Sequence, residues 1–449
     1  VVSIAPERAR AEADRMDAER ASGRQSGRLH GIPVTLKDSF ETEGLRTTAG
    51  SESLAEYEPS KDAPTVARLR QQGAIIMGKT NMPTFNLDLQ AQNPVFGATK
   101  NPHDPSRTSG GSAGGAAAAV AAALTSIDYC SEIAGSIRIP AHYCGVFGHK
   151  SSYGISKLTG HLPHGPGDGF WSWLDLAVGG PMTRSAEDLQ VGLLAGAGAD
   201  PAEATGWKLS LPAPRARRLQ HFRLAAWLDD AFCPIDSEVR KAIESAVESI
   251  RSKGGTVDTS PKLPMQLEEM TLPYRKLLYG AFAAFWPEEE FEEMRKVSTP
   301  GGRYQGHPDK PRVYADTVGD HRDWVRADIA RNHAKAAWSE FFATYDAVLM
   351  PVTPTPALPH HGPDEAWFGP PMKVDGETRP YLDQISWTGF VNYIGNPSTS
   401  VPLSMSKDGL PIGMQLMGPY LEDLTVIELA RALEQAGVAQ YVQPAPLRS

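Results

Sequence analysis

Residues 63–78, APTVARLRQQGAIIMG, contain the pattern that decides the fold class. Residues 63–72 predict a helix, and residues 74–78 predict a buried strand directly after it. Upstream, residues 31–36, GIPVTL, predict another short strand that ends at Lys37 and Asp38. Helices that alternate with strands in this way are typical of α/β proteins.

The same alternation extends outward from this stretch. A helix is expected over residues 5–21, an Ala-rich and closely packed one over 116–124, a strand over 345–350, two strands over 398–403 and 412–416, and a closing helix over 423–436. Residues 101–115 predict a loop, and residues 131–140 predict an irregular segment. The intervening residues 200–340 are more charged and show helical patterns, which indicates a helical insertion.

Composition excludes several classes of protein. The 449 residues carry a formal net charge of −9 and no basic block, so a nucleic-acid partner is not expected. No stretch is apolar for long enough to predict a membrane helix. Three cysteines without a C-x-x-C pair predict neither a disulfide framework nor a zinc site, and they favour a reducing compartment such as the cytoplasm.

Ser112 lies in the sequence GGSAG, which fits the G-x-S-x-G pattern of a nucleophile elbow. An elbow requires a strand directly before the serine, and the preceding residues 102–108 are rich in Pro, Asp and Ser. A flexible Gly/Ser turn is the alternative interpretation. No G-K-[ST] follows, so the motif is not a phosphate-binding P-loop.

Ser136 and Lys37 are the other two candidates. Ser136 lies in AGSIRIP, where consecutive backbone amides in a bend can form a cradle for an oxyanion; an ordinary loop serine is the alternative. Lys37 follows an apolar strand. It is either a solvated partner of Asp38 or a lysine kept neutral by burial, so that it acts as a base.

Taken together, five ordered blocks resemble the amidase signature family, over residues 28–436 except for much of 200–340. The blocks are GIPVTLKD at 31–38, GGSAGG at 110–115, GSIRIPA at 135–141, GGPMTRSAED at 179–188, and GNP at 395–397 followed by VP at 401–402 and DGLPIGMQL at 408–416. The resemblance implies one α/β domain over residues 1–449, with a mixed β-sheet covered by helices on both faces. The insertion at 200–340 would then pack over the active-site side.

The resemblance also implies a Ser–cis-Ser–Lys triad on Ser136, Ser112 and Lys37. Ser136 would be the nucleophile, Ser112 would follow a cis peptide bond and relay a proton, and Lys37 would be the base. Backbone amides of three residues would form the oxyanion hole, and three further residues would support it. The former are Ile133, Ala134 and Gly135, and the latter are Ser131, Glu132 and Arg138.

This chain departs from the family pattern in two places. Residues 130–135 are CSEIAG where family members usually carry G-T-D, a variable residue and two glycines. Ala134 adds a methyl group, which would cause strain if the position requires a positive φ. Only one helix is expected before the Lys37 strand, where the family commonly has several, so we expect that an N-terminal segment precedes this sequence.

Other residues invite a functional interpretation. His103, His360 and His361 have no metal-ligand spacing, and no metal site is expected. Phe170, Trp171 and Trp173 form an aromatic group in a Gly/Pro-rich stretch. They are either core residues or part of a pocket for an aromatic or bulky apolar substrate.

The resemblance implies a hydrolase that cuts amide, anilide or carbamate C–N bonds through an acyl-enzyme, similar to an amidase, aryl acylamidase or urethanase. No cofactor is expected; the expected partner is a small-molecule substrate, and the expected state is a monomer or homodimer. One alternative is an amidotransferase component of the A type, which would hydrolyse glutamine within a complex. The other is a non-catalytic binding protein on the same scaffold.

Overall fold

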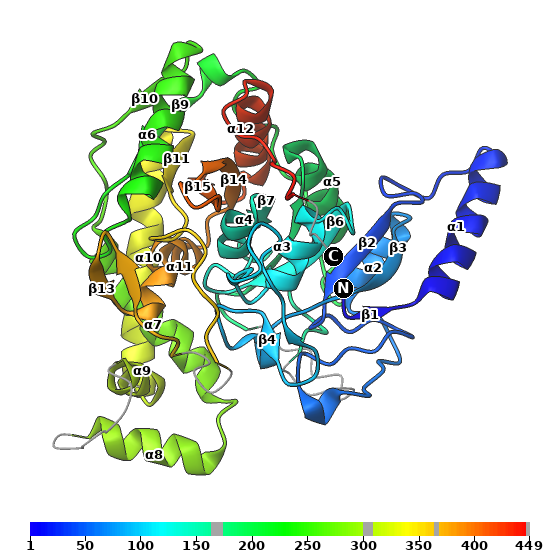
Figure 1. Cartoon of the computed structure of the whole chain (residues 1–449), viewed down its shortest axis with the longest axis horizontal. Coiled ribbons are helices and arrows are strands. Elements are labelled where there is room, and N and C mark those ends of the chain that lie inside the picture. Colours follow the sequence, from blue (N-terminus) through cyan, green and yellow to red (C-terminus); the bar gives the residue numbers. More distant parts are fainter. Residues whose placement is uncertain (163–173, 300–308, 363–367, 446–449) are drawn as a thin grey trace.

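Strands from most of the chain join one mixed sheet in the computed structural model, which describes residues 1–162, 174–299, 309–362 and 368–445. In this part of the chain the sheet has eleven strands, in the order β1-β3-β2-β6-β8-β7-β14-β15-β11-β9-β10 (Figure 1). They are β1 (Ser3–Ile4), β2 (Pro33–Lys37), β3 (Ile75–Thr80), β6 (Ile127–Glu132), β7 (Phe147–Lys150), β8 (Val178–Thr183), β9 (Arg223–Ala226), β10 (Thr256–Asp258), β11 (Ala347–Pro351), β14 (Ser398–Met405) and β15 (Pro411–Met417). Two short pairs stand apart, β4 (Gln92–Asn93) with β5 (Gly97–Ala98) and β12 (Met372–Val374) with β13 (Glu377–Arg379).

The helices complete the α/β architecture. They are α1 (Pro6–Ala21), α2 (Pro64–Gln71), α3 (Gly114–Ala121), α4 (Arg138–Cys144), α5 (Ala186–Gly196), α6 (Ser237–Ser252), α7 (Leu267–Ala283), α8 (Glu288–Ser298), α9 (Lys310–Thr317), α10 (His321–Thr344), α11 (Ser386–Ile394) and α12 (Asp423–Gln435). None of the helices in the described ranges combines the length and apolar character that a membrane crossing requires.

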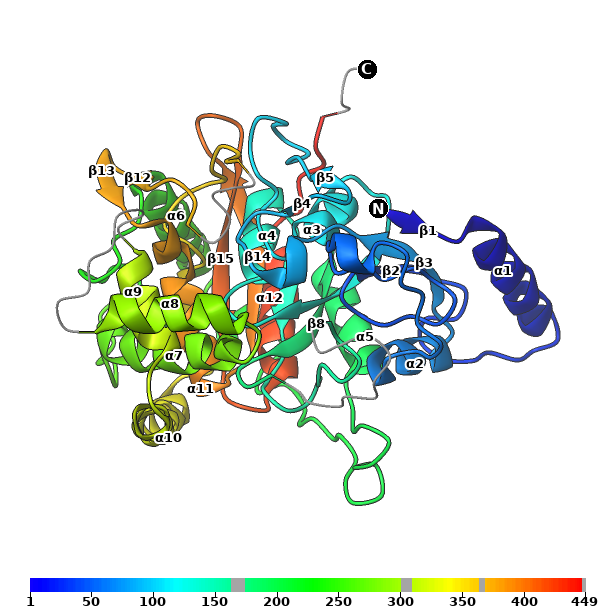
Figure 2. The same cartoon turned by 90° about the horizontal axis from the view of Figure 1, so that it is seen from below.

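Side chains along β2 and β6 alternate between the two faces of the sheet, and apolar side chains lie on one of these faces. Val34 and Leu36 pack there with Tyr129 and with α2. The next residues along each strand face the other way, where Cys130 packs against the alanines of α3 and against α4. Figure 2 shows α3 and α4 on one side of the sheet and α2 and α5 on the other. The predicted mixed sheet with helices on both faces is therefore confirmed.

The Ala-rich helix α3 packs as closely as its composition predicts. All eight of its residues are buried. A side chain at Gly115 would place its Cβ 2.4 Å from the backbone of Asn81, so only glycine allows this approach. The helix holds the preceding loop, which contains Ser112, against the sheet.

Several expected elements differ from the structure. Helix α3 begins at Gly114, two residues before its expected start. The segment 131–140 is irregular only over 133–137, because β6 continues through Glu132 with all of its residues buried and α4 begins at Arg138. Residues 200–340 are not helical throughout, since β9 and β10 extend the main sheet by parallel pairing.

The parallel pairing of β2 with β6 creates the site. Thr35 lies opposite Asp128, and Leu36 lies opposite Tyr129. Carboxyl ends of neighbouring parallel strands lie at the same edge of a sheet. Lys37 at the end of β2 and Ser131 near the end of β6 are therefore brought together.

Candidate active site

Lys37 is fully buried and makes three contacts at the end of β2. Its Nζ donates to Ser112 Oγ at 2.6 Å and to Ser131 Oγ at 3.1 Å, and it lies 3.4 Å from the Ser131 carbonyl oxygen. Ser131 Oγ also lies 2.8 Å from His161 Nε2. The lysine is thus held by hydroxyls, and its ammonium has no carboxylate within ion-pair distance among the described residues.

Burial dominates the electrostatics of this lysine. It lowers the pKa of Lys37 from 10.5 to about 7, although nearby Cys130, Asp128 and Glu132 act to raise it. Asp128 lies beneath the site and accepts hydrogen bonds from Thr35 and Cys130 at 2.6 and 3.0 Å. Burial raises the pKa of this carboxyl too. A large share of Lys37 is therefore neutral at neutral pH, as a general base must be.

Ser112 is positioned by its glycine-rich loop. The Gly111–Ser112 peptide bond is cis. A Cβ at Gly111 would lie 2.5 Å from the backbone of Leu89 and Gln90, so glycine is needed for this close approach. The loop leads directly into α3, which fixes the Ser112 hydroxyl beside Lys37.

Ser136 lies in the turn between β6 and α4. The amide of Ala113 donates to the Ser136 carbonyl oxygen at 3.2 Å, which joins the two serine loops. Within the described ranges, no hydrogen bond connects the Ser136 hydroxyl to Ser112 or Lys37. The structure therefore brings Lys37 and Ser112 into direct contact and places Ser136 in the adjoining loop, 5% exposed.

The loop before Ser136 directs its carbonyl groups away from the serine. Tyr274 Oη donates to the Ile133 carbonyl oxygen at 3.1 Å, and Thr388 Oγ1 donates to that of Ala134 at 2.8 Å. No hydrogen bond from the amides of Ala134, Gly135 or Ser136 is found in the part of the chain that the structure describes. These amides are thus available to a ligand.

The methyl group of Ala134 does not strain this loop. The positive φ of the turn, 118°, falls on Gly135, and Ala134 is not among the residues with positive φ. A side chain at Gly135 would also meet Thr388 Oγ1 at 2.4 Å. The glycine that the backbone requires is therefore present, and the departure at Ala134 is compatible with the loop.

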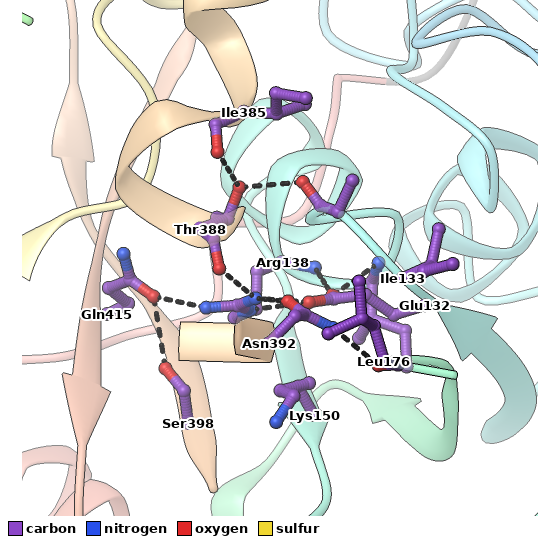
Figure 3. A network of polar contacts seen from close by, with 12 residues as sticks. Glu132, Ile133, Arg138, Lys150, Leu176, Ile385, Thr388, Asn392, Ser398 and Gln415 are labelled. Carbon is purple, nitrogen blue, oxygen red and sulfur yellow. Dashed lines mark hydrogen bonds and ion pairs between the residues drawn. The ribbon is translucent and has the colours of Figure 1, made fainter. Parts of the chain in front are cut away.

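A buried ion pair anchors the other end of the loop. Arg138 and Glu132 are both fully buried and form an ion pair, with Arg138 Nε donating to Glu132 Oε1 at 2.8 Å (Figure 3). The second carboxylate oxygen accepts the amides of Ile137 and Arg138 at 2.9 and 3.1 Å. The guanidinium also donates to Gln415, Asn392 and the Thr388 carbonyl. The ion pair therefore joins the end of β6 to the start of α4 and fixes both ends of the loop that contains Ser136.

Replacing Arg138 by methionine is expected to lower the free energy of unfolding by about 3–5 kcal/mol, because Glu132 would remain buried without its partner. Urea unfolding monitored by circular dichroism measures the change. Arg15→Met is the matched control, since it breaks an exposed helical pair, Arg15–Glu19, that solvent screens, and it should change stability little. Equal losses in both variants would contradict the structural role of the buried pair.

A small cavity of about 40 Å³ adjoins Ser136, with room for only a few waters. Two turns of α7 contribute Leu278 and Phe282, so part of the 200–340 region forms its wall. The described lining residues are Asn86, Asp88, Leu89, Ile133, Ala134, Ser136, Leu278, Phe282, Tyr381, Leu382 and Ile385. This mostly apolar wall suits an apolar substrate portion.

The aromatic group and the histidines that stand out in the sequence differ in what the structure shows of them. Phe170, Trp171 and Trp173 lie outside the described residues, so their proposed place in the pocket stays a prediction. His103 contacts the Cys144 carbonyl, whereas His360 contacts Gln90. Within the described ranges, no group of three or more His, Cys, Asp or Glu side chains is arranged to hold a metal ion.

Sequence reasoning did not identify several residues of this site. Tyr274 and Thr388 hold the loop, His161 contacts Ser131, and Asp88 and Tyr381 line the cavity. Each comes from a segment far from the serine motifs, and no local pattern marks it. In the sequence, Asp88 differs from its surroundings only as a charged residue between Leu87 and Leu89.

Comparisons with known proteins agree with this geometry. A family model described as Amidase matches residues 1–427. The chain is 30% identical over 464 aligned residues to the A component of the glutamyl-tRNA(Gln) amidotransferase of Koribacter versatilis, covering 97% of this chain and 90% of that protein. A crystal structure of an amidase has a TM-score of 0.76 at 29% identity, covering 96% and 90% of the two chains. A bacterial aryl acylamidase of the amidase signature family shares the fold, with a TM-score of 0.78 at 24% identity and coverage of 97% and 88%.

Proposed function

The chain belongs to the amidase signature family of hydrolases, and we propose that it cuts amide, anilide or carbamate C–N bonds of small molecules through a serine acyl-enzyme. One observation carries this proposal: a fully buried lysine whose Nζ is 2.6 Å from a serine hydroxyl and whose pKa is lowered to about 7 by burial. A binding protein has no need for a lysine desolvated beside a serine. The geometry therefore favours catalysis over a non-catalytic scaffold.

In the first step, Ser136 Oγ forms a bond to the substrate carbonyl carbon. Its proton moves to Ser112 Oγ, and the proton of Ser112 moves to neutral Lys37. This route requires the two serine hydroxyls to approach when substrate binds, and catalytic hydrogen bonds are often long before that point. The electron pair of the C=O bond moves onto oxygen, which becomes an oxyanion.

The amides of Ala134, Gly135 and Ser136 are proposed to receive this oxyanion. They carry no other hydrogen bond among the described residues, and the carbonyls of Ile133 and Ala134 are already bound elsewhere. Donors fixed before the reaction stabilise developing charge without reorganisation. Ile133 completes the loop as the fourth member of the proposed hole.

Collapse of this intermediate breaks the C–N bond. The proton on Lys37 returns through Ser112 to the leaving nitrogen, which departs as a neutral amine. Water then forms a bond to the acyl carbon and gives a proton through Ser112 to Lys37. The bond between the acyl carbon and Ser136 Oγ breaks, the proton returns through Ser112 to Ser136 Oγ, and the acid leaves. No step requires a cofactor, and a small molecule is the proposed partner.

Amidotransferase activity is the second candidate. It is favoured by the name of the relative from Koribacter versatilis, at 30% identity. As one component of such a complex, this chain would hydrolyse glutamine and would require partner chains. Glutaminase activity of the purified chain, measured beside gel filtration, separates this candidate from a self-sufficient amidase that acts as a monomer or homodimer.

The proposed location is the cytoplasm. All three cysteines, Cys130, Cys144 and Cys233, are buried and unpaired, which fits a reducing compartment.

A substrate panel tests the proposed function. Aliphatic amides, anilides, aryl carbamates, esters and glutamine would be compared by kcat/KM with the purified chain. We expect turnover of anilides or carbamates, together with labelling of Ser136 by a fluorophosphonate, located by peptide mass spectrometry. Absence of both turnover and labelling would rule out the proposal.

The rate for a neutral anilide is expected to rise with pH through about 7. Lys37 accepts a proton only when neutral, so kcat/KM should rise about tenfold per pH unit below the pKa and level above it. An ordinary lysine would place the rise near pH 10.5. A substrate without ionisable groups is needed, so that the profile reports the enzyme.

Lys150 provides the control for this profile. Burial lowers its pKa to about 7 as well, but its Nζ donates to the Asn396 carbonyl oxygen, away from the serines. Lys150→Met should therefore keep the rise near pH 7. The assignment to Lys37 would be contradicted if the rise in kcat/KM disappeared in Lys150→Met. It would also be contradicted if the rise in the unmodified chain were centred above pH 9.

A further inference from the structure

One carboxylate stands in the wall of the Ser136 cavity. Asp88 lines this cavity with Leu89, Leu278 and Phe282, and it is the only charged side chain in the wall that the structure describes. It is 8% exposed. A carboxylate this close to the reacting serine can select among substrates by charge.

Neighbouring groups fix the orientation of Asp88. Its Oδ1 accepts the Leu89 amide at 2.7 Å and the Tyr381 hydroxyl at 3.0 Å. His361 Nε2 lies 3.2 Å from the same hydroxyl and 3.4 Å from Asp88 Oδ2. The carboxylate is therefore held in place before any substrate arrives, which lowers the entropic cost of an interaction with it.

Asp88 also lines a second and larger cavity, of about 410 Å³. Three aromatic side chains belong to its wall, together with two further carboxylates and one lysine. They are Trp286, Tyr314 and Phe368, Glu290 and Glu293, and Lys310. Because Asp88 borders both spaces, we call the larger cavity the outer chamber.

The outer chamber already accommodates one ammonium group. Lys310 Nζ lies over the Phe368 ring, 5.2 Å from its centroid. Aromatic faces and carboxylates both attract cations, and the attraction increases where water is excluded. Three carboxylates against one lysine in its described wall thus favour an organic cation over an anion.

We propose that Asp88 selects amide substrates that carry a protonated amine, with the ammonium group at Asp88 and in the outer chamber while the amide carbonyl lies at Ser136. This inference rests on the proposed function and names its substrate class. The apolar side chains of α7, Leu278 and Phe282, would lie against the carbon chain or ring between the two groups. The substrate is therefore an amphipathic amino amide.

The same charges disfavour free glutamine. Its α-ammonium group fits the chamber, but its α-carboxylate would lie near Asp88, Glu290 and Glu293. Like charges that are brought together oppose binding, and in the described wall Lys310 is one cation against three carboxylates. The proposal therefore predicts poor glutamine hydrolysis by the isolated chain.

Two isosteric pairs of substrates test the proposal. On the leaving-group side, 4-(aminomethyl)acetanilide is compared with 4-ethylacetanilide; on the acyl side, 3-aminopropionanilide is compared with butyranilide. In at least one pair, kcat/KM should be about tenfold or more higher for the cationic member, the size expected of a charged hydrogen bond. Higher kcat/KM for the neutral member in both pairs would overturn the proposal.

Asp88→Asn removes the charge and keeps the shape. It should abolish the preference for the cationic member, with the larger loss of kcat/KM on that member. Glu289→Gln, on α8 outside the chamber lining, removes an equal charge and should preserve the preference. Equal losses on both members in Asp88→Asn would show a merely structural role and refute the selection of cations.

A binding measurement keeps the test independent of turnover. Calorimetry with benzylamine at pH 7 should show binding to the unmodified chain and at least about tenfold weaker binding to Asp88→Asn. Equal affinities would overturn the proposal even if the variants were inactive. If benzylamine binds and no anilide is cleaved, the proposed function fails while the cation site stands.

Discussion

Ser136→Ala is expected to lower kcat/KM for both an anilide and a matched nitrophenyl ester by on the order of 10⁴-fold or more. Without the Ser136 hydroxyl, no acyl-enzyme can form, so the amide and ester reactions fail together. Ser136 is mostly buried at the edge of the cavity, and its loop is held by backbone and Arg138 contacts that do not involve its hydroxyl. The variant should therefore fold, and thermal unfolding near the unmodified temperature verifies this.

Substitutions at two further serines distinguish the nucleophile from its neighbours. Ser112→Ala should slow both substrates but leave Ser136 open to a fluorophosphonate, whereas Ser136→Ala should prevent labelling. Ser109→Ala is the matched control in the same glycine-rich loop, since its hydroxyl donates only to the Thr99 carbonyl at 3.0 Å. Labelling of Ser112 in the unmodified chain, or turnover by Ser136→Ala near the original rate, would reassign the nucleophile.

Five strands of the sheet could be predicted because their signals are local, whereas the mixed sheet as a whole was implied by the family resemblance. Strands β1, β6, β7 and β8 were not predicted as strands. The apolar run at residues 74–78 predicts a strand without knowledge of its neighbours, and β3 contains all of it except Ala74. Strand β14 contains the strand expected over residues 398–403. Strands β9 and β10 were missed because they are short and lie among charged helices. Strand β9 joins the sheet by parallel pairing with β11, and β10 joins it by parallel pairing with β9, where Val257 lies opposite Leu224.

The three candidate side chains could be identified from motifs, but their contacts could not. Lys37 reaches Ser112 because β2 pairs with β6 and because α3 packs closely on the same face of the sheet. Both conditions depend on tertiary packing that no single motif contains. The family resemblance identified the three candidate residues, and the pairing of the strands explains why Lys37 and Ser112 are in contact.

Support for the loop comes from residues far along the chain. Arg138 bonds to Asn392 and Gln415, more than 250 positions away. Their side chains are ordinary amides in apolar segments, so nothing in their local sequence marks a role. The same holds for Asp88, whose importance depends on the cavity that it shares with Ser136.

Lys37→Met is expected to lower kcat/KM for an anilide about 10²–10⁴-fold more than for a matched nitrophenyl ester. Neutral lysine accepts the serine proton in both reactions, but only the amide requires that proton on its leaving group. An amide nitrogen is a poor leaving group until protonated, whereas nitrophenolate leaves unaided. For the ester, kcat/KM should therefore fall only by the contribution that Lys37 makes as a base.

Methionine suits this test because it fills the space of the lysine. Lys37 is fully buried, and alanine would leave a cavity in the sheet edge that destabilises the chain. The apolar replacement also removes a buried charge site, so the variant should remain folded. Thermal unfolding and fluorophosphonate labelling of Ser136 at alkaline pH verify that the nucleophile is still in place.

Lys79 supplies the matched control for a buried lysine near the same strands. It lies on β3, opposite Leu36 of β2, and its Nζ donates to Thr42 Oγ1 at 3.0 Å and to the Phe40 carbonyl. Burial lowers its pKa to about 8, so it resembles Lys37 in environment but does not contact the serines. Lys79→Met should change stability and leave the ratio of anilide to ester rates intact. If Lys37→Met lowered both substrates equally, the proton on the leaving nitrogen would have to come from water or another side chain, and Lys37 would be a base alone.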